Sequence, residues 1–330
     1  MIAKYRHDLP QFADNLFLTD GGIETTLIYQ DGFELPSFAA FDLLRYDRGR
    51  AALRRYFQTH AAVAQDLGVG FVLESATWRA SADWGAKLGY DDTALAAANL
   101  QAIALLHALR AEYETCSTPI VISGCIGPRG DGYKVGTRMT SKQAEAYHSV
   151  QTNLFAASGA DLVTAMTMTY SEEAIGITLA AQKSGMPVAI AFTTETDGRL
   201  PSGETLESAI TCVDDATGSA PAYYVINCAH PTHFTQQLQS RGSWMQRVRG
   251  LRANASAKSH AELDTCTELD AGNPLELAAR YAELRSEFPQ LTILGGCCGT
   301  DHRHIRAIGE ACVQPRRIRP TCTAVSAAQT

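Results

Sequence analysis

The sequence lacks features that would place the protein outside the cell or in a membrane. No apolar run approaches the ~20 residues of a membrane-spanning helix, and residues 1–15 carry charges instead of a signal peptide's apolar core. The chain also has fewer basic than acidic residues, with 28 Lys and Arg against 35 Asp and Glu, which gives a net charge of −7. An acidic protein is a poor ligand for nucleic acid or anionic membrane. We therefore expect a cytoplasmic protein that acts on small molecules.

Signals of a nucleotide-binding or multidomain chain are missing as well. No Gly-x-Gly-x-x-Gly turn follows the first predicted strand, which disfavours a dinucleotide-binding sheet. The chain shows no linker, low-complexity block or short internal repeat. Its 330 residues, 45% hydrophobic, suit one large domain with a substantial core.

Short apolar runs alternate with longer amphipathic stretches along the chain. Eight runs rich in Val, Ile and Leu, without strict alternation, are typical of strands buried on both faces. Strict strand–helix alternation predicts parallel strands, and eight units predict a single (β/α)8 TIM barrel, with an open doubly wound sheet as the alternative. We expect residues 1–315 to form the barrel and 316–330 a flexible tail. The predicted strands are 15–19, 70–74, 119–123, 161–166, 187–192, 223–227, 248–252 and 291–294, and the predicted helices are 50–67, 93–115, 140–158, 171–184, 203–217, 232–239, 274–288 and 301–313.

Three of the nine cysteines follow predicted strands at the end of the barrel where active sites lie. Cys228 follows the sixth run, and Cys297 and Cys298 follow the eighth. In a reducing compartment they are expected to be thiols. Three thiolates suit Zn²⁺ and leave its fourth position open for a substrate. Because a coordinated thiol is deprotonated, such a site presents a thiolate substrate at neutral pH. The alternative is redox chemistry at the vicinal pair, and the other cysteines are interpreted as small apolar residues: Cys116, Cys125, Cys212, Cys266, Cys312 and Cys322.

Three motifs together resemble those of the homocysteine S-methyltransferase family, over about residues 15–312. They are Asp20-Gly21-Gly22, Asn227-Cys228 and Gly295-Gly296-Cys297-Cys298-Gly299. The resemblance implies a zinc-dependent (β/α)8 barrel with Cys228, Cys297 and Cys298 as the metal ligands. It also implies that further residues bind substrate, namely Asp20, Gly21, Gly22, Thr77, Asn227 and Asn254.

One position departs from the family pattern. Members usually carry a Glu after the fourth strand that binds the substrate amino group, and the alignment places Met166 there. A methionine cannot pair with an ammonium group. Either Glu24, Glu74 or Glu195 compensates, or the acceptor is another thiol or a selenol.

The expected reaction is direct methyl transfer from a sulfonium or betaine-type donor to the thiolate of homocysteine, as in methionine biosynthesis. Aromatic faces recognise methylated cations best, and Trp78 is the preferred candidate, ahead of Trp84, Tyr90, Tyr133 and Trp244. The partners expected are a thiol acceptor and a methyl donor, with the protein a monomer or small homo-oligomer. Rival hypotheses are a methyl-transfer module fed by methylcobalamin or methylfolate, a zinc-storing or thiol-redox protein, and a regulatory binding module without turnover. Four histidines near the cysteines could also bind zinc, but they fall where helices should begin. They are therefore assigned to positions behind the metal ligands or at the surface: His230, His233, His302 and His304.

Overall fold

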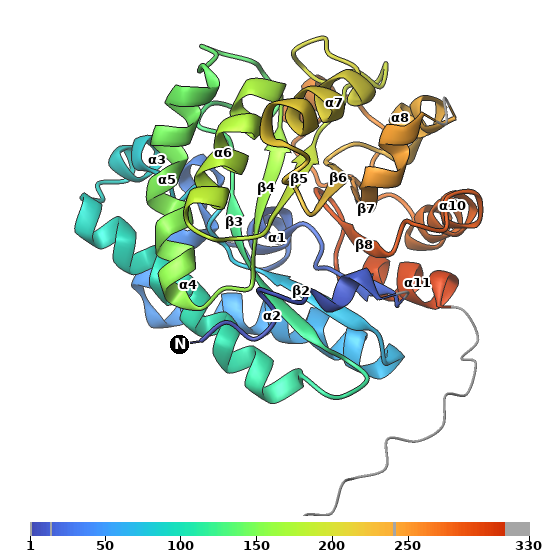
Figure 1. Cartoon of the computed structure of the whole chain (residues 1–330). Helices are drawn as coiled ribbons and strands as arrows, with labels where there is room; N and C mark the ends of the chain where they lie inside the picture. The colour runs from blue at the N-terminus through green and yellow to red at the C-terminus, as the bar shows by residue number, and fades with distance from the viewer. Residues whose placement is uncertain (1, 14, 240–241, 314–330) are drawn as a thin grey trace, which may run out of the picture.

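The computed structural model describes residues 2–13, 15–239 and 242–313. Its eight parallel strands form one closed barrel in chain order, from β1 round to β8, which pairs with β1 (Figure 1). The single TIM barrel predicted from the sequence is therefore confirmed. The predicted tail and Cys322 lie outside the described residues. The strands are β1 (Phe17–Leu18), β2 (Gly70–Glu74), β3 (Ile120–Ile126), β4 (Leu162–Met168), β5 (Val188–Phe192), β6 (Tyr223–Asn227), β7 (Val248–Ala253) and β8 (Ile293–Gly296).

Helices cover the outside of the barrel between successive strands (Figure 1). Their ends follow local signals, as in α5, where the Thr140 side chain caps the first turn and Gln143 completes a capping box. Gly159 ends that helix at φ 82°, in the left-handed region open to glycine. The α-helices are α1 (Ile23–Thr25), α2 (Asp47–Leu67), α3 (Ala82–Lys87), α4 (Asp92–Tyr113), α5 (Ser141–Ser158), α6 (Ser171–Lys183), α7 (Leu206–Thr217), α8 (Pro231–Leu238), α9 (His260–Asp264), α10 (Pro274–Glu287) and α11 (His302–Cys312).

Five short segments lie outside the strand–helix alternation. One precedes β1, three lie between α1 and α2, and one leads into β7. They are η1 (Pro10–Phe12), η2 (Thr26–Gln30), η3 (Pro36–Phe38), η4 (Ala40–Arg45) and η5 (Ser243–Arg247).

The core occupies two layers. Side chains such as Phe17, Val121 and Val225 fill the inside of the barrel, and a larger cluster lies between strands and helices. Because both faces of each strand are buried, the strands read as continuous apolar runs.

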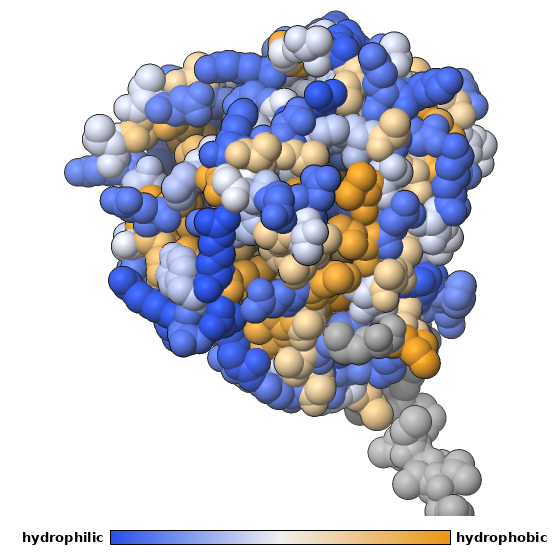
Figure 2. All heavy atoms as spheres, turned by 90° about the vertical axis from the view of Figure 1, so that its left-hand side faces the viewer, coloured by the Kyte–Doolittle hydropathy of each residue, from blue (hydrophilic) through white to orange (hydrophobic). Residues whose placement is uncertain are grey.

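One helix meets the length and composition test for a membrane span among the described residues, contrary to the sequence expectation. This helix is α4, and 44% of its most apolar window is buried inside the protein. Its Leu95, Ile103 and Leu106 pack in the layer between barrel and helices, so packing in the core accounts for its apolar character. On the side where α3, α4 and α5 lie, the surface is mostly hydrophilic with apolar side chains between (Figure 2).

Candidate active site

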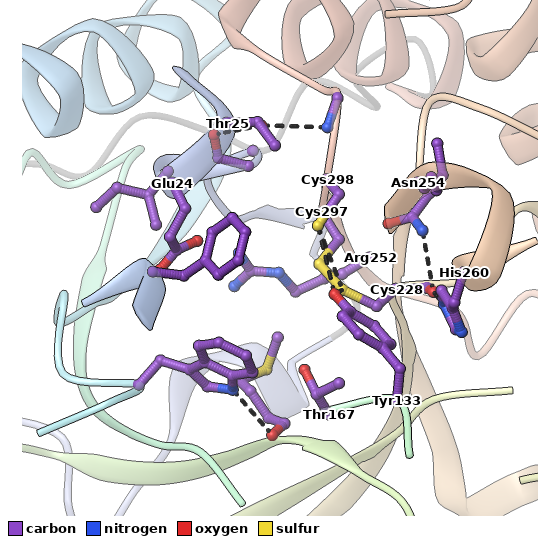
Figure 3. A pocket seen from close by; sticks show the side chains of 18 of the residues that line it. Glu24, Thr25, Tyr133, Thr167, Cys228, Arg252, Asn254, His260, Cys297 and Cys298 are labelled. Carbon is purple, nitrogen blue, oxygen red and sulfur yellow. Dashed lines mark hydrogen bonds between the residues drawn. A yellow bond between two sulfur atoms is a disulfide. The ribbon is translucent and has the colours of Figure 1, made fainter. Parts of the chain in front are cut away.

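A cavity of about 360 Å³ opens at the carboxyl ends of the barrel strands. Its wall is formed by the loops after β1, β2 and β3, the ends of β4 and β6, and the loops after β7 and β8 (Figure 3). The segment after β7 carries α9 and lines the cavity from Asn254 to Asp270. The volume is in the range of small-molecule sites.

The three predicted cysteines meet in this cavity. Their sulfur atoms lie within 4.8 Å of one another, and no other group of His, Cys, Asp or Glu in the described part of the chain converges in this way. A disulfide bond joins Cys228 to Cys297, and Cys228 Sγ lies 3.9 Å from Cys298 Sγ. Burial raises the pKa of the Cys298 thiol to about 11, so without a cation it stays protonated at neutral pH.

The chemistry of this donor set fits a zinc ion. Two sulfurs bound tetrahedrally at ~2.3 Å from zinc lie roughly 3.8 Å apart, close to the separation of Cys228 and Cys298. Cys297 completes a three-sulfur set once its bond to Cys228 is reduced. Three protein thiolates leave one position for a substrate.

The backbone of Cys228 is held in an unusual conformation. Its φ of 53° lies in the left-handed region, which is costly for a residue with a side chain. Its carbonyl oxygen accepts hydrogen bonds from Asn254 Nδ2 at 3.0 Å, His260 Nε2 at 2.6 Å and Thr193 Oγ1 at 3.4 Å. These donors fix the turn that aims the Cys228 sulfur into the cavity.

Tyr133 covers the sulfur cluster from the loop after β3. Its hydroxyl lies 3.4 Å from Cys228 Sγ and 3.5 Å from Cys298 Sγ. Its ring packs against that of His260, with centroids 4.2 Å apart and the planes tilted by 37° (Figure 3). Tyr133 was one of several aromatic candidates in the sequence, whereas nothing local distinguished His260. Both positions depend on how two long loops pack together.

A buried ion triad forms the inner wall. Arg252 of β7 donates to Asp20 Oδ1 and Glu74 Oε2, each at 2.6 Å, and to the Gly296 carbonyl at 3.2 Å. Burial opposes the charge of Arg252, but the two carboxylates raise its pKa above the ordinary value. The Asp20 carboxylate is thus already paired within the protein.

Glu24 presents the other deep carboxyl group. It lines the cavity from α1, and no hydrogen bond or ion pair joins its side chain to another described residue. Burial raises the pKa of Glu24 to about 7, with the charge of Asp20 adding to the effect and Arg79 and Arg252 opposing it.

Trp78 and Met166 lie against each other in the wall. Trp78 Nε1 donates to the Met166 carbonyl at 3.4 Å. The Arg79 guanidinium lies between two indoles, 3.8 Å from the Trp78 ring and 3.9 Å from the Trp84 ring. The Arg79 guanidinium thus covers one face of the Trp78 ring. Tyr90 and Trp244 do not line the cavity.

Most residues predicted for the site line the cavity, and three do not. Thr77 is buried beside it and donates to the Cys125 carbonyl at 2.7 Å. Glu195 lies 3.3 Å from His260 Nδ1, and Asn227 bonds Thr167. The residues that line it are Asp20, Gly21, Gly22, Glu24, Trp78, Met166, Cys228, Asn254, Cys297 and Cys298.

All four histidines lie at helix starts, His230 and His233 at that of α8 and His302 and His304 at that of α11. His230 Nδ1 accepts from Thr232 N–H and caps α8, and His304 forms the capping box of α11 with Asp301.

Comparisons with known proteins show the family to which the chain belongs. The family model for homocysteine S-methyltransferase matches residues 17–312. The metallated form of the Escherichia coli homocysteine methyltransferase MmuM superposes with a TM-score of 0.70 at 18% identity, covering 92% of this chain and 98% of that one. Its oxidized form gives 0.71 at 19% identity, covering 92% and 97%. No curated protein sequence matches the chain. The family model spans most of the chain and includes all three cysteines, so the protein belongs to the homocysteine S-methyltransferase family and is a methyltransferase.

Proposed function

We propose that the protein transfers a methyl group from a sulfonium or betaine-type donor to the thiolate sulfur of homocysteine, and that Cys228, Cys297 and Cys298 hold a zinc ion for this reaction. The observation that carries the proposal is the meeting of the three sulfurs in a cavity large enough for small substrates. Family membership supports the reaction class. Methionine biosynthesis in the cytoplasm, by a monomer or small homo-oligomer, is the proposed setting.

A zinc ion held by three thiolates supplies an open position at which a substrate thiol loses its proton. The protein's own residues hold the ligands in place. Asn254 and His260 fix the Cys228 backbone, and the Tyr133 hydroxyl lies against two of the sulfurs. Tyr133 and His260 also shield the cluster from water, which favours a reaction between opposite charges.

The transfer itself needs no general base once the acceptor is a thiolate. A lone pair on the acceptor sulfur forms the new bond to the methyl carbon. The bond from that carbon to the donor's sulfur or nitrogen breaks, and its electron pair stays on the donor. Both charges are neutralised in this step, so the role of the site is to align donor and acceptor.

The charge of the cavity wall supports a donor with a positive centre. Carboxylates outnumber guanidinium groups among the lining residues, and several of them stand near the mouth. Aromatic rings also line it, and these attract methylated cations. The mouth carboxylates are Asp131, Asp264, Glu268 and Asp270, and the lining aromatics are Tyr29, Phe38, Trp78 and Tyr133.

The proposal is tested by measuring zinc per chain and methyl transfer in one reduced preparation. We expect about one zinc per chain and turnover of homocysteine with a sulfonium or betaine donor. Cys298→Ser is expected to lose both. Cys212→Ser, which removes an exposed thiol in α7, is the matched control and is expected to keep both. Wild-type protein that binds zinc but methylates no thiol would contradict the proposed reaction.

The Cys228–Cys297 disulfide favours a second candidate, a thiol-redox protein. This candidate predicts reversible oxidation without a requirement for metal. Turnover that depends on zinc and persists in excess reductant excludes it. Thiol–disulfide exchange by metal-free protein, without methyl transfer, supports it.

A further inference from the structure

We propose that Glu24 determines acceptor specificity by binding the α-ammonium group of an amino acid thiol. The inference rests on the proposed function, because it places the acceptor's thiol at the cysteine cluster. The sequence left three carboxylates open for this role, and the structure separates them.

The other two candidates are already engaged. Glu74 accepts from Arg252 Nη1 at 2.6 Å, deep in the barrel. Glu195 lies outside the cavity lining, 3.3 Å from His260 Nδ1. Asp20, also in the wall, is paired with Arg252. Glu24 therefore remains as a carboxyl group that lines the cavity without a partner among the described residues.

Neither of the nearby arginines, Arg252 and Arg79, forms an ion pair with Glu24. Arg252 already donates to two carboxylates and a carbonyl oxygen, and none of its hydrogen bonds goes to Glu24. Arg79 donates to the Gly130 carbonyl at 2.9 Å and is held between two indole rings. An unpaired carboxylate in a partly buried wall is costly, and burial accordingly raises its pKa to about 7. A ligand ammonium removes that cost by supplying the missing charge.

Glu24 is fixed relative to the cysteines. The Gly22 N–H donates to the Thr300 carbonyl at 3.0 Å, and Gly299 N–H donates to Thr25 Oγ1 at 3.2 Å. A Cβ at Gly22 would come 2.6 Å from the Cys297 carbonyl oxygen, so only glycine allows this approach. The turn that carries Glu24 thus packs directly on the loop that carries Cys297 and Cys298.

Glu24 and the sulfur cluster line one cavity, where the two ends of an amino acid thiol would each find a partner. Figure 3 shows the Glu24 carboxyl group and the sulfur cluster on different sides of the cavity, with Arg252 between them. A donor's methyl-bearing centre must lie in line with the reacting sulfur, which places it near the cysteines. A methylated cation without N–H groups also cannot donate hydrogen bonds to a carboxylate, whereas an ammonium group donates three. The acceptor's ammonium is therefore the better match for Glu24.

The test is calorimetric binding of two thiols to the reduced, zinc-loaded protein. L-homocysteine carries the amino group, and 4-mercaptobutanoate is the same chain without it. We expect Glu24→Gln to weaken homocysteine binding about 10- to 100-fold, the effect of losing a charged hydrogen bond, and to leave 4-mercaptobutanoate binding unchanged. Glu24→Asp, which keeps the charge, is expected to recover part of the affinity. Glu268→Gln removes a carboxylate from the cavity mouth and is expected to change neither affinity.

The outcomes separate this inference from the proposed function. If wild-type protein binds both thiols equally, or if Glu24→Gln weakens both to the same extent, the thiol site stands and the role of Glu24 is wrong. If Glu268→Gln has the same effect as Glu24→Gln, the overall negative charge of the cavity, and not a contact with Glu24, determines the preference for homocysteine. If wild-type protein binds neither thiol, the proposed function itself fails. Melting temperatures of the variants that equal or exceed that of wild-type protein confirm that folding is unaffected.

Discussion

The side-chain amide of Asn227 holds Thr167 by two hydrogen bonds. Its Oδ1 accepts from the Thr167 N–H at 3.1 Å, and its Nδ2 donates to Thr167 Oγ1 at 2.9 Å. Thr167 has φ 64°, a left-handed conformation that is rare for a β-branched residue. Asn227 thus joins the ends of β4 and β6 and stabilises a strained turn in the wall of the cavity.

Asn227→Ala is expected to lower the free energy of unfolding by about 2–4 kcal/mol, because two buried hydrogen bonds and the support of a strained residue are lost. Zinc content should fall too, because Asn227 directly precedes Cys228. Urea denaturation and metal analysis measure both effects. Asn99→Ala is the control, since Asn99 is equally buried but bonds α4 and its neighbours. A zinc content that falls as far in the control contradicts a local effect.

Arg252→Met is expected to be among the most destabilising single changes in the barrel. It leaves Asp20 and Glu74 as uncompensated buried charges, at a cost of about 3–5 kcal/mol at pH 7. The loss should shrink as the pH falls, because burial raises the pKa of Glu74 and its protonation removes one of the unpaired charges. Chemical denaturation at pH 5 and pH 7 measures this.

Arg247→Met is the matched control for this change. Arg247 pairs with Asp214 at the outside of the barrel, where its side chain is 29% exposed. We expect a loss of about 1 kcal/mol there. Equal losses in both variants contradict a special role for the inner triad.

The sequence predicts the barrel well because its signals are local. All eight strands lie within a few residues of the predicted runs, and β2 and β6 have the predicted bounds. Short elements such as α1, α3 and α9 were missed because so few residues carry no helical period.

The site was predictable only where strand order determines it. Cys228 and the Cys297–Cys298 pair were expected to meet because β6 and β8 flank β7, and they do. Arg252 is an unusual residue for a buried strand such as β7, because it carries a charge. The role of Arg252 becomes clear only when the barrel closes, because closure brings Asp20, after β1, and Glu74, in β2, into contact with it. The direction of a side chain at a strand end, as for Thr77, also depends on its neighbours.

Glu24 should make the stability of the protein depend on pH. Its pKa is about 7 in the folded protein, against 4.5 as the ordinary value. The folded state then binds more protons than the unfolded state between these two values. Stability therefore falls as the pH rises through this window, and the full cost is present above pH 7. The groups that act on Glu24 are Asp20, which raises its pKa, and Arg79 and Arg252, which lower it.

Glu24→Gln removes this cost. We expect the variant to be more stable than wild-type protein at pH 8, by up to about 3 kcal/mol, and similar to it at pH 4.5. Urea denaturation without ligand at both pH values measures the difference. A variant that is less stable at pH 8 would indicate that Glu24 has a cationic partner within the protein.

Trp78 offers the test of donor recognition, because the chain provides a matched indole. Trp78 lines the cavity and Trp84 does not, yet both contact the Arg79 guanidinium. If the exposed surface of Trp78 attracts the donor's methylated centre, Trp78→Ala should raise the KM for the donor about 3- to 30-fold, with zinc content unchanged. Trp84→Ala should leave that KM unaltered, because Trp84 does not line the cavity. Initial rates at saturating acceptor measure both. Equal increases in the two variants would instead assign the effect to the position of Arg79, since the contact with Arg79 is what the two indoles share.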